Sequence, residues 1–322
     1  MSENITIDPL AILLVSGKTA DLRSGLIDAI QAMGHDAERD LAVVPGNPET
    51  LENDLERVLA LEEIAVAIVE LDGDDDPAFA LDAIEPLVED EAAVLIGVLT
   101  TLDVAGFWTD FRDGDADTVR QLVADIESAS LAVLVDGEET DGDAVRTTEG
   151  FVHNLNPAAA VLRLEALAGL TVPELAEAIA EAEAGDDAPM PDEDDESLAG
   201  EVDAWGFNSF TWTTETRLDR GRFMALFENW PVEVLRAHGV ARFDDGATVV
   251  LSVVRDTVSI DEYDGDDPHD HDHDHGDHDH EVALRDDEDL TLGADESEIA
   301  FVGIGMPVAD LVTRLDACTV AA

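Results

Sequence analysis

Six of the nine histidines in this chain of 322 residues fall in one short stretch, residues 267–280, which reads DPHDHDHDHGDHDH. They are His269, His271, His273, His275, His278 and His280. In an extended segment, residues two apart point the same way, so the first four can present their imidazoles along one edge. Neutral imidazole is the commonest side-chain ligand for zinc, nickel, copper and cobalt, and the interleaved aspartates add oxygen ligands. The tract therefore predicts a divalent-metal site; the alternative is a solvated loop that binds metal only incidentally.

The rest of the composition is dominated by acid. The chain has 77 acidic residues against 16 basic ones and a formal charge of −61, and Lys18 is its only lysine. Such a charge repels nucleic acids and anionic membrane surfaces, so both are excluded as partners. Its simplest cause is a salt-accumulating cytoplasm, where strong screening removes the mutual repulsion of carboxylates. We therefore expect a halophilic source, and most carboxylate pairs are then solvated surface groups.

Other features of the sequence point to a cytoplasmic protein. Cys318 is the single cysteine, so neither an intrachain disulfide nor a cysteine-rich zinc site can form. The first residues lack the basic segment and the apolar run of a signal peptide. No apolar stretch is long enough for a membrane span.

The first part of the chain alternates short apolar runs with amphipathic segments. Strands are expected over residues 11–15, 64–71, 93–99, 131–135 and 160–164. Helices are expected over residues 25–34, 50–61, 116–128 and 172–184, and another is expected after the strand at 131–135, running through His153. The stretch between the first strand and the first helix, SGKTADLRS, is expected to be a loop. Strands alternating with helices at this spacing predict an α/β domain over residues 1–184, with a mostly parallel sheet and helices on both faces.

A second domain follows an acidic linker. Between residues 185 and 200 apolar periodicity disappears and Pro, Asp and Glu dominate. Beyond it we expect strands at residues 205–214, 240–243, 248–260 and 299–304, and helices at residues 220–229 and 308–318. Residues 201–322 are thus predicted to form a small α+β unit, with the histidine tract in one of its loops.

Four segments of this second domain form a recognisable set. They are GFNSFTW at residues 206–212, WPVEVLRAHG at residues 230–239, IAFVGIG at residues 299–305 and LDAC at residues 315–318. In these segments the chain resembles the C-terminal module of the CobW family of P-loop GTPases, which includes metallochaperones and cobalamin-biosynthesis proteins. A His-rich insertion in or near this module is also a habit of the family. The resemblance implies a P-loop GTPase-like first domain, which would bind GTP and Mg²⁺.

The first domain resembles the family in outline while its motifs are eroded. Laid on the phosphate-binding pattern GxxxxGK[ST], the chain offers Gly17, then Leu22 for the second glycine, Arg23 for the lysine, and Ser24. Arginine is longer, planar and forked, so it does not simply replace that lysine. Lys18 and Thr19 also form a GKT string with Gly17, which we interpret as coincidence because it follows the strand directly.

Further family positions are also altered. The cysteine motif expected before residue 50 is absent, and Glu70 and Gly73 keep part of the segment after the next strand. Glu138 stands where the resemblance implies the carboxylate that reads guanine. Glu70 and Asp72 could hold Mg²⁺ with Ser24, or they are two more solvated carboxylates. The segment LNPAAAVLRL at residues 155–164 matches the family well.

Three functions remain open at this point. The leading hypothesis is a cytoplasmic zinc or cobalt chaperone or buffer that holds metal in the histidine tract and serves a metal-requiring client protein, with GTP binding and hydrolysis weak or lost. A second hypothesis keeps a working GTPase, coupled to metal insertion, in which Arg23 and Ser24 hold phosphate and Glu138 reads guanine. A third is an interaction module without catalysis, in which the histidine tract is only a spacer.

Overall fold

A computed structural model describes residues 9–33, 40–61, 63–73, 75, 77–137, 140–185, 202–262 and 295–320. The chain divides into two compact units, residues 1–192 and 193–322. Within the described ranges, no helix is long and apolar enough to cross a membrane.

The first unit is built on a parallel sheet of six strands in the order β2-β3-β1-β4-β5-β6. The strands are β1 (Leu10–Gly17), β2 (Asp40–Pro45), β3 (Ile64–Glu70), β4 (Ala93–Asp103), β5 (Leu131–Val135) and β6 (Ala160–Arg163). The central strand β1 lies between β3 and β4, and its residues Ile12 to Val15 are fully buried. Strands buried on both faces read as continuous apolar runs, which is why this one was visible in the sequence.

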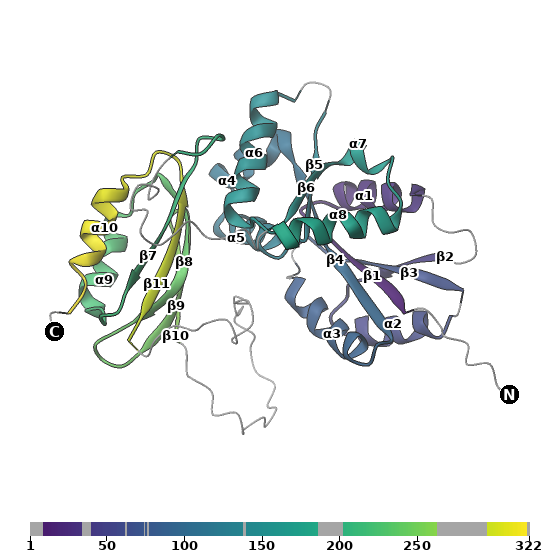
Figure 1. The fold of residues 1–322 in the computed structure, drawn as a ribbon, viewed down its shortest axis with the longest axis horizontal. Helices are drawn as coiled ribbons and strands as arrows, with labels where there is room; N and C mark the ends of the chain where they lie inside the picture. Colours follow the sequence, from purple (N-terminus) through teal and green to yellow (C-terminus); the bar gives the residue numbers. More distant parts are fainter. Residues whose placement is uncertain are drawn as a thin grey trace. The chain divides into compact units, whose positions relative to one another are not determined.

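Helices cover both faces of this sheet (Figure 1). They are α1 (Ala20–Ala32), α2 (Leu51–Leu59), α3 (Pro77–Glu89), α4 (Val104–Asp113), α5 (Ala116–Glu127), α6 (Gly142–Leu155), α7 (Leu164–Leu167) and α8 (Val172–Gly185). On one face α1, α7 and α8 pack against Leu13 and Val15, and on the other α2 and α3 pack against Ile12 and Leu14. Alternate residues of a strand point to opposite faces, so β1 contributes to both cores.

The second unit has two layers. Its antiparallel sheet has the strand order β10-β9-β8-β11-β7, with α9 and α10 on one face (Figure 1). Its elements are β7 (Asn208–Thr214), α9 (Arg220–Leu226), the short 3₁₀ helix η1 (Phe227–Asn229), β8 (Val234–Arg242), β9 (Thr248–Val254), β10 (Thr257–Glu262), β11 (Ser297–Gly303) and α10 (Val308–Asp316). The predicted fold class, α/β followed by a small α+β unit, is confirmed.

Several sequence-based element assignments need correction. The single strand expected over residues 248–260 is a hairpin, because Arg255 takes a positive φ of 57° and turns the chain between β9 and β10. The elements β2, α3, α4 and α7 were not predicted. The expected loop between the first strand and helix is far shorter than predicted, since α1 begins at Ala20 rather than at residue 25.

The LNP segment that matches the CobW pattern has a structural role. Asn156, which is 7% exposed, directs its side-chain amide nitrogen at the carbonyl oxygens of Ile126, Glu127 and Ala129, at 3.0, 3.1 and 2.8 Å. These carbonyls lie at the end of α5 and in the turn to β5, where the regular hydrogen bonds between successive helical turns run out. Asn156 therefore supplies the C-terminal cap of α5 from a distant part of the chain.

Replacing Asn156 with alanine should remove all three hydrogen bonds from its amide to these carbonyls and lower the free energy of unfolding by about 2 kcal/mol. Urea unfolding in high-salt buffer, followed by circular dichroism, measures this loss. Asn154→Ala is the matched control: the Asn154 amide donates to Gly150 within its own helix, and this change should cost clearly less. Equal costs for the two variants would contradict the capping role.

Candidate functional site

The connection between β1 and α1 has no room for a phosphate-binding loop. The strand ends at Gly17 and the helix begins at Ala20, so only Lys18 and Thr19 lie between them. Thr19 is the N-cap, and its hydroxyl accepts a hydrogen bond from the backbone N–H of Leu22 at 3.4 Å. Leu22, Arg23 and Ser24, which the gapless match places in the phosphate loop, are therefore residues of the helix. A helix cannot wrap backbone amides around a polyphosphate as a glycine-rich loop does.

The early start of the helix has a local cause. Threonine is a favoured N-cap residue because its hydroxyl satisfies a free amide of the first turn. Ala20 and Leu22 are strong helix formers, and Asp21 places a negative charge near the positive end of the helix dipole. The stretch that was expected to be a loop therefore has a complete helix start signal at Thr19.

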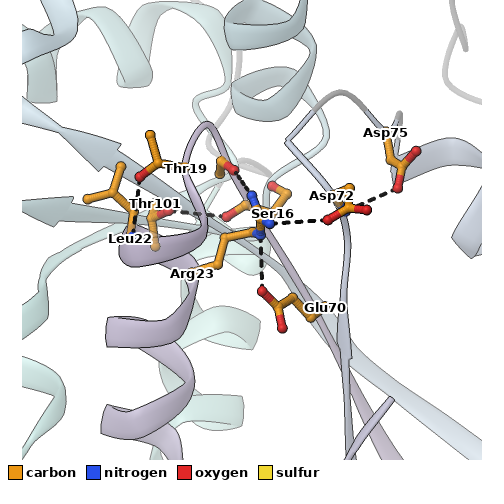
Figure 2. A network of polar contacts seen from close by, with 9 residues as sticks. Ser16, Thr19, Leu22, Arg23, Glu70, Asp72, Asp75 and Thr101 are labelled. Atoms are coloured by element: carbon orange, nitrogen blue, oxygen red, sulfur yellow. Dashed lines mark hydrogen bonds and ion pairs between the residues drawn. The ribbon is translucent and has the colours of Figure 1, made fainter. Parts of the chain in front are cut away.

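Arg23 turns its guanidinium back into the protein. The residue is 5% exposed, and its Nη1 donates to the carbonyl oxygen of Gly17 at 2.9 Å. Its Nε donates to Glu70 and its Nη2 to Asp72, each at 3.3 Å. Figure 2 shows this fan of contacts from the first turns of α1 to the ends of β1 and β3. All three guanidinium nitrogens are thus engaged by the protein, and a phosphate would have to displace those contacts.

Two glycines allow this close packing. A Cβ atom on Gly17 would lie 1.9 Å from the Thr101 hydroxyl oxygen, and the residue has a φ of +149°. A Cβ on Gly73 would lie 2.5 Å from the Lys18 carbonyl oxygen and 3.3 Å from Nη1 of Arg23. Gly17 and Gly73 therefore serve the contact between the strand ends, which explains their presence without a nucleotide.

The structure brings together Gly17, Arg23, Glu70 and Gly73, four of the positions predicted to bind nucleotide. Ser24 lies one residue along the helix from Arg23, with an exposed side chain. Glu138 falls outside the described residues, as do the six tract histidines His269, His271, His273, His275, His278 and His280. No group of three or more His, Cys, Asp or Glu in the described ranges could hold a metal ion.

Lys18 is also committed to an ion pair. Its ammonium lies 2.7 Å from Oδ1 of Asp110, on α4. Glu70, Asp72 and Asp75 stand along the adjacent strand end, where the Asp75 carboxylate also accepts from the backbone N–H of Asp72 at 3.0 Å. Both cations near the edge are therefore neutralised by carboxylates, and the remaining field disfavours a phosphate group.

In the second unit, the motif residues hold the core together. Nε1 of Trp212 donates to Asp316 on α10 at 3.0 Å. The Trp230 ring lies 5.0 Å from Phe227 and 6.2 Å from Phe301, measured between ring centroids. Asn208 accepts from the backbone N–H of Met306 at 3.2 Å, joining the start of β7 to the turn after β11. Each motif thus ties a strand to the helix layer or to a neighbouring turn.

Two arginines hold the residues that flank the tract-bearing segment. Arg217, between β7 and α9, donates from Nε to Asp295 at 2.6 Å, just before β11. Arg220, at the start of α9, pairs with Glu262 at the end of β10 and with Asp245 at 3.1 Å. The last residue of β10 and the residues leading into β11 are therefore fixed to the same short stretch of chain.

A comparison with known protein families decides what this second unit is. Residues 207–319 match the family described as the cobalamin synthesis protein CobW C-terminal domain. The second unit thus matches the CobW C-terminal domain. The match starts inside the GFNSFTW segment and extends past LDAC, so it covers the motifs that carried the resemblance.

Comparisons of the whole chain with known proteins show less than the family match of the second unit does. No curated protein matches the sequence. Among solved structures, the Zn(II)-bound YjiA GTPase from E. coli aligns with a TM-score of 0.42 and 15% identity, covering 97% of this chain and 99% of that one. A Zn(II)-bound triple mutant of YjiA GTPase aligns with a TM-score of 0.41 and 14% identity over the same shares. At these values the two alignments say nothing about the chemistry of this chain.

The last motif of the CobW C-terminal domain contains the single cysteine. Cys318 is 2% exposed, and its thiol donates to the carbonyl oxygen of Arg314 at 3.2 Å. Burial raises the pKa of the Cys318 thiol above its usual value. Since the thiolate is the reactive and metal-binding form, this environment makes the Cys318 thiol a poor nucleophile and a poor metal ligand.

Arg23→Ala should destabilise the first unit by about 1–3 kcal/mol, because the Gly17 carbonyl and Glu70 lose a charged donor. Arg23→Lys should restore little of this, since one ammonium cannot span three acceptors as a planar guanidinium does. The control is Arg57→Ala, which removes an ion pair to Asp54 from a side chain that is 77% exposed. Urea unfolding in high salt measures all three, and equal losses for Arg23→Ala and Arg57→Ala would overturn the structural role.

Cys318 should react with a thiol reagent such as DTNB more slowly in the native protein than in urea, by a factor on the order of 100. Thr313→Cys in a Cys318→Ala background is the matched control, because Thr313 is exposed on α10, the helix that Cys318 follows. Its thiol should react at once at pH 8. Native Cys318 reacting at the rate of that control thiol would show that the residue is accessible.

Proposed function

We propose that this protein handles divalent metal ions, zinc or cobalt, through its His/Asp tract, and that GTP binding and hydrolysis by its first unit are weak or lost. It would act as a cytoplasmic chaperone or buffer that keeps metal available to a metal-requiring client protein. The observation that carries the nucleotide half of the proposal is the buried guanidinium of Arg23. The observation that carries the metal half is the density of histidines in residues 267–280.

Three features of the first unit oppose nucleotide binding. The two-residue connection from Gly17 to Ala20 provides no loop to surround the phosphates. The cation that could replace the motif lysine already donates to Gly17, Glu70 and Asp72. The carboxylates around it would also have to be desolvated beside an anion, which raises the free energy of the complex.

The chemistry of the tract favours metal binding, and the family match of the second unit supports it. Alternating histidine and aspartate offers nitrogen and oxygen ligands in a locally negative field, which attracts divalent cations. The tract is inserted in a CobW C-terminal domain, whose family description names cobalamin synthesis, and cobalamin is a cobalt compound. Zinc and cobalt both accept imidazole ligands, so the two ions are the first to test.

Titration calorimetry of the full chain in high-salt buffer, separately with Zn²⁺, Co²⁺ and GTP–Mg²⁺, tests both halves. Metal should bind, and affinity should fall as the pH drops from 8 to 5, because imidazole protonates near pH 6.5 and loses its lone pair. Changing all six tract histidines to asparagine should weaken metal binding at least about tenfold, since most nitrogen ligands disappear. The single change His153→Asn, outside the tract, should leave it unaltered.

Two results would count against this proposal. Metal affinity that is the same at pH 8 and pH 5, or that survives loss of the tract histidines, would exclude them as ligands. Micromolar GTP binding that Arg23→Ala abolishes would show that the guanidinium holds phosphate, and the GTPase hypothesis would then replace this one.

A further inference from the structure

The two sheets end in four edge strands, and three of these carry a feature that discourages pairing. The strand orders place β2, β6, β10 and β7 at the edges. Strand β2 contains Asp40 and Pro45, β6 contains Arg163, and β10 ends in Asp261 and Glu262. Charges and prolines on edge strands are the usual protection against pairing with another chain. Strand β7, NSFTWTT, has neither over its seven residues.

The outer side of β7 is also free of backbone partners within the part of the chain that the structure describes. The strand pairs with β11 in an unbroken register from Asn208 opposite Gly303 to Thr214 opposite Ser297. Outside that pairing, no backbone–backbone hydrogen bond in the described ranges involves residues 208–214. An unpaired edge of regular strand is a template for a further strand.

The negative charge of the chain limits the kind of strand that can pair with the free edge of β7. Across the chain 29% of residues are charged and the formal charge is −61, so most surfaces of two copies repel each other. Strand β7 is a neutral stretch in that surface, with Ser209, Thr211 and Thr213 exposed on one face. Phe210 and Trp212 alternate with them and are 9% and 5% exposed. The strand is therefore suited to a partner that is itself neutral and extended.

The sequence of β7 is complementary to itself. Turned about Thr211, the strand places Ser209 opposite Thr213 and Phe210 opposite Trp212 in a second copy, while Thr211 faces its own counterpart. Hydroxyl pairs and aromatic pairs are both favourable across antiparallel strands, and no like charges meet. A two-fold arrangement of this kind is the commonest symmetry of soluble assemblies.

We propose that β7 pairs antiparallel with β7 of a second copy of this chain, centred on Thr211, so that the two five-stranded sheets become one continuous sheet. The interface uses the exposed backbone edge and the hydroxyl-bearing face of β7. The pairing does not depend on metal or nucleotide, so its test is independent of the test of the proposed function.

Cysteine cross-linking of the full chain tests the pairing and its register. Thr211→Cys should give a disulfide-linked dimer under mild oxidation, because directly opposite residues bring their Cβ atoms within about 5 Å. Chains with Ser209→Cys should link to chains with Thr213→Cys when mixed, and should link to themselves much less. The parent chain should give no linked dimer, since Cys318 is 2% exposed.

A charge at the centre of the interface gives the complementary test. Thr211→Lys places two ammonium groups opposite each other and should raise the dissociation constant of the dimer at least about tenfold. Ser259→Lys, at an equivalent edge position on β10, should not change it. Both are measured by size-exclusion chromatography with light scattering in high salt. A parent chain that stays monomeric at every concentration, or a dimer unaffected by Thr211→Lys, would overturn the proposal.

Discussion

The arrangement of the first unit depends on one buried guanidinium. Arg23 connects the start of α1 to the ends of β1 and β3, and it does so with a side chain that is 5% exposed. A buried cation is tolerated only when it is paired and hydrogen-bonded, so Glu70 and the Gly17 carbonyl are part of the same requirement. Glycine is then required at positions 17 and 73. A Cβ atom would collide with Thr101 at the first position and with the Lys18 carbonyl at the second.

Much of this could be predicted from the sequence, and the failures have identifiable causes. Long apolar runs such as that around Leu13 located the central strands, because burial on both faces leaves a strong pattern. The hairpin at Arg255 was missed because a non-glycine residue in the left-handed region leaves no sequence signal. The start of α1 at Ala20 was missed because the helix was placed on the apolar periodicity that begins at residue 25, although Thr19 is a favourable capping residue.

Part of the candidate site was also predicted from the sequence, and part of it was not. The sequence indicated that arginine at position 23 does not simply replace the phosphate-binding lysine. The structure shows that its guanidinium donates to Gly17, Glu70 and Asp72 instead. No pattern in one sequence predicts that Asp72 and Glu70 would both reach it, since such contacts depend on how distant strand ends meet. In the second unit, Trp212 and Trp230 of the motif segments contact the helix layer and the neighbouring rings.

The pairing of Arg217 with Asp295 and of Arg220 with Glu262 has an evolutionary consequence. Glu262 and Asp295 border residues 263–294, and each forms an ion pair with the stretch from Arg217 to Arg220. These ion pairs hold the end of β10 and the residues before β11 in place. The entropic cost of a loop grows only slowly with its length, by about 0.6 kcal/mol for each doubling. Lineages could therefore lengthen or shorten this insertion at little cost to folding, and the number of its histidines could change by simple repeat expansion.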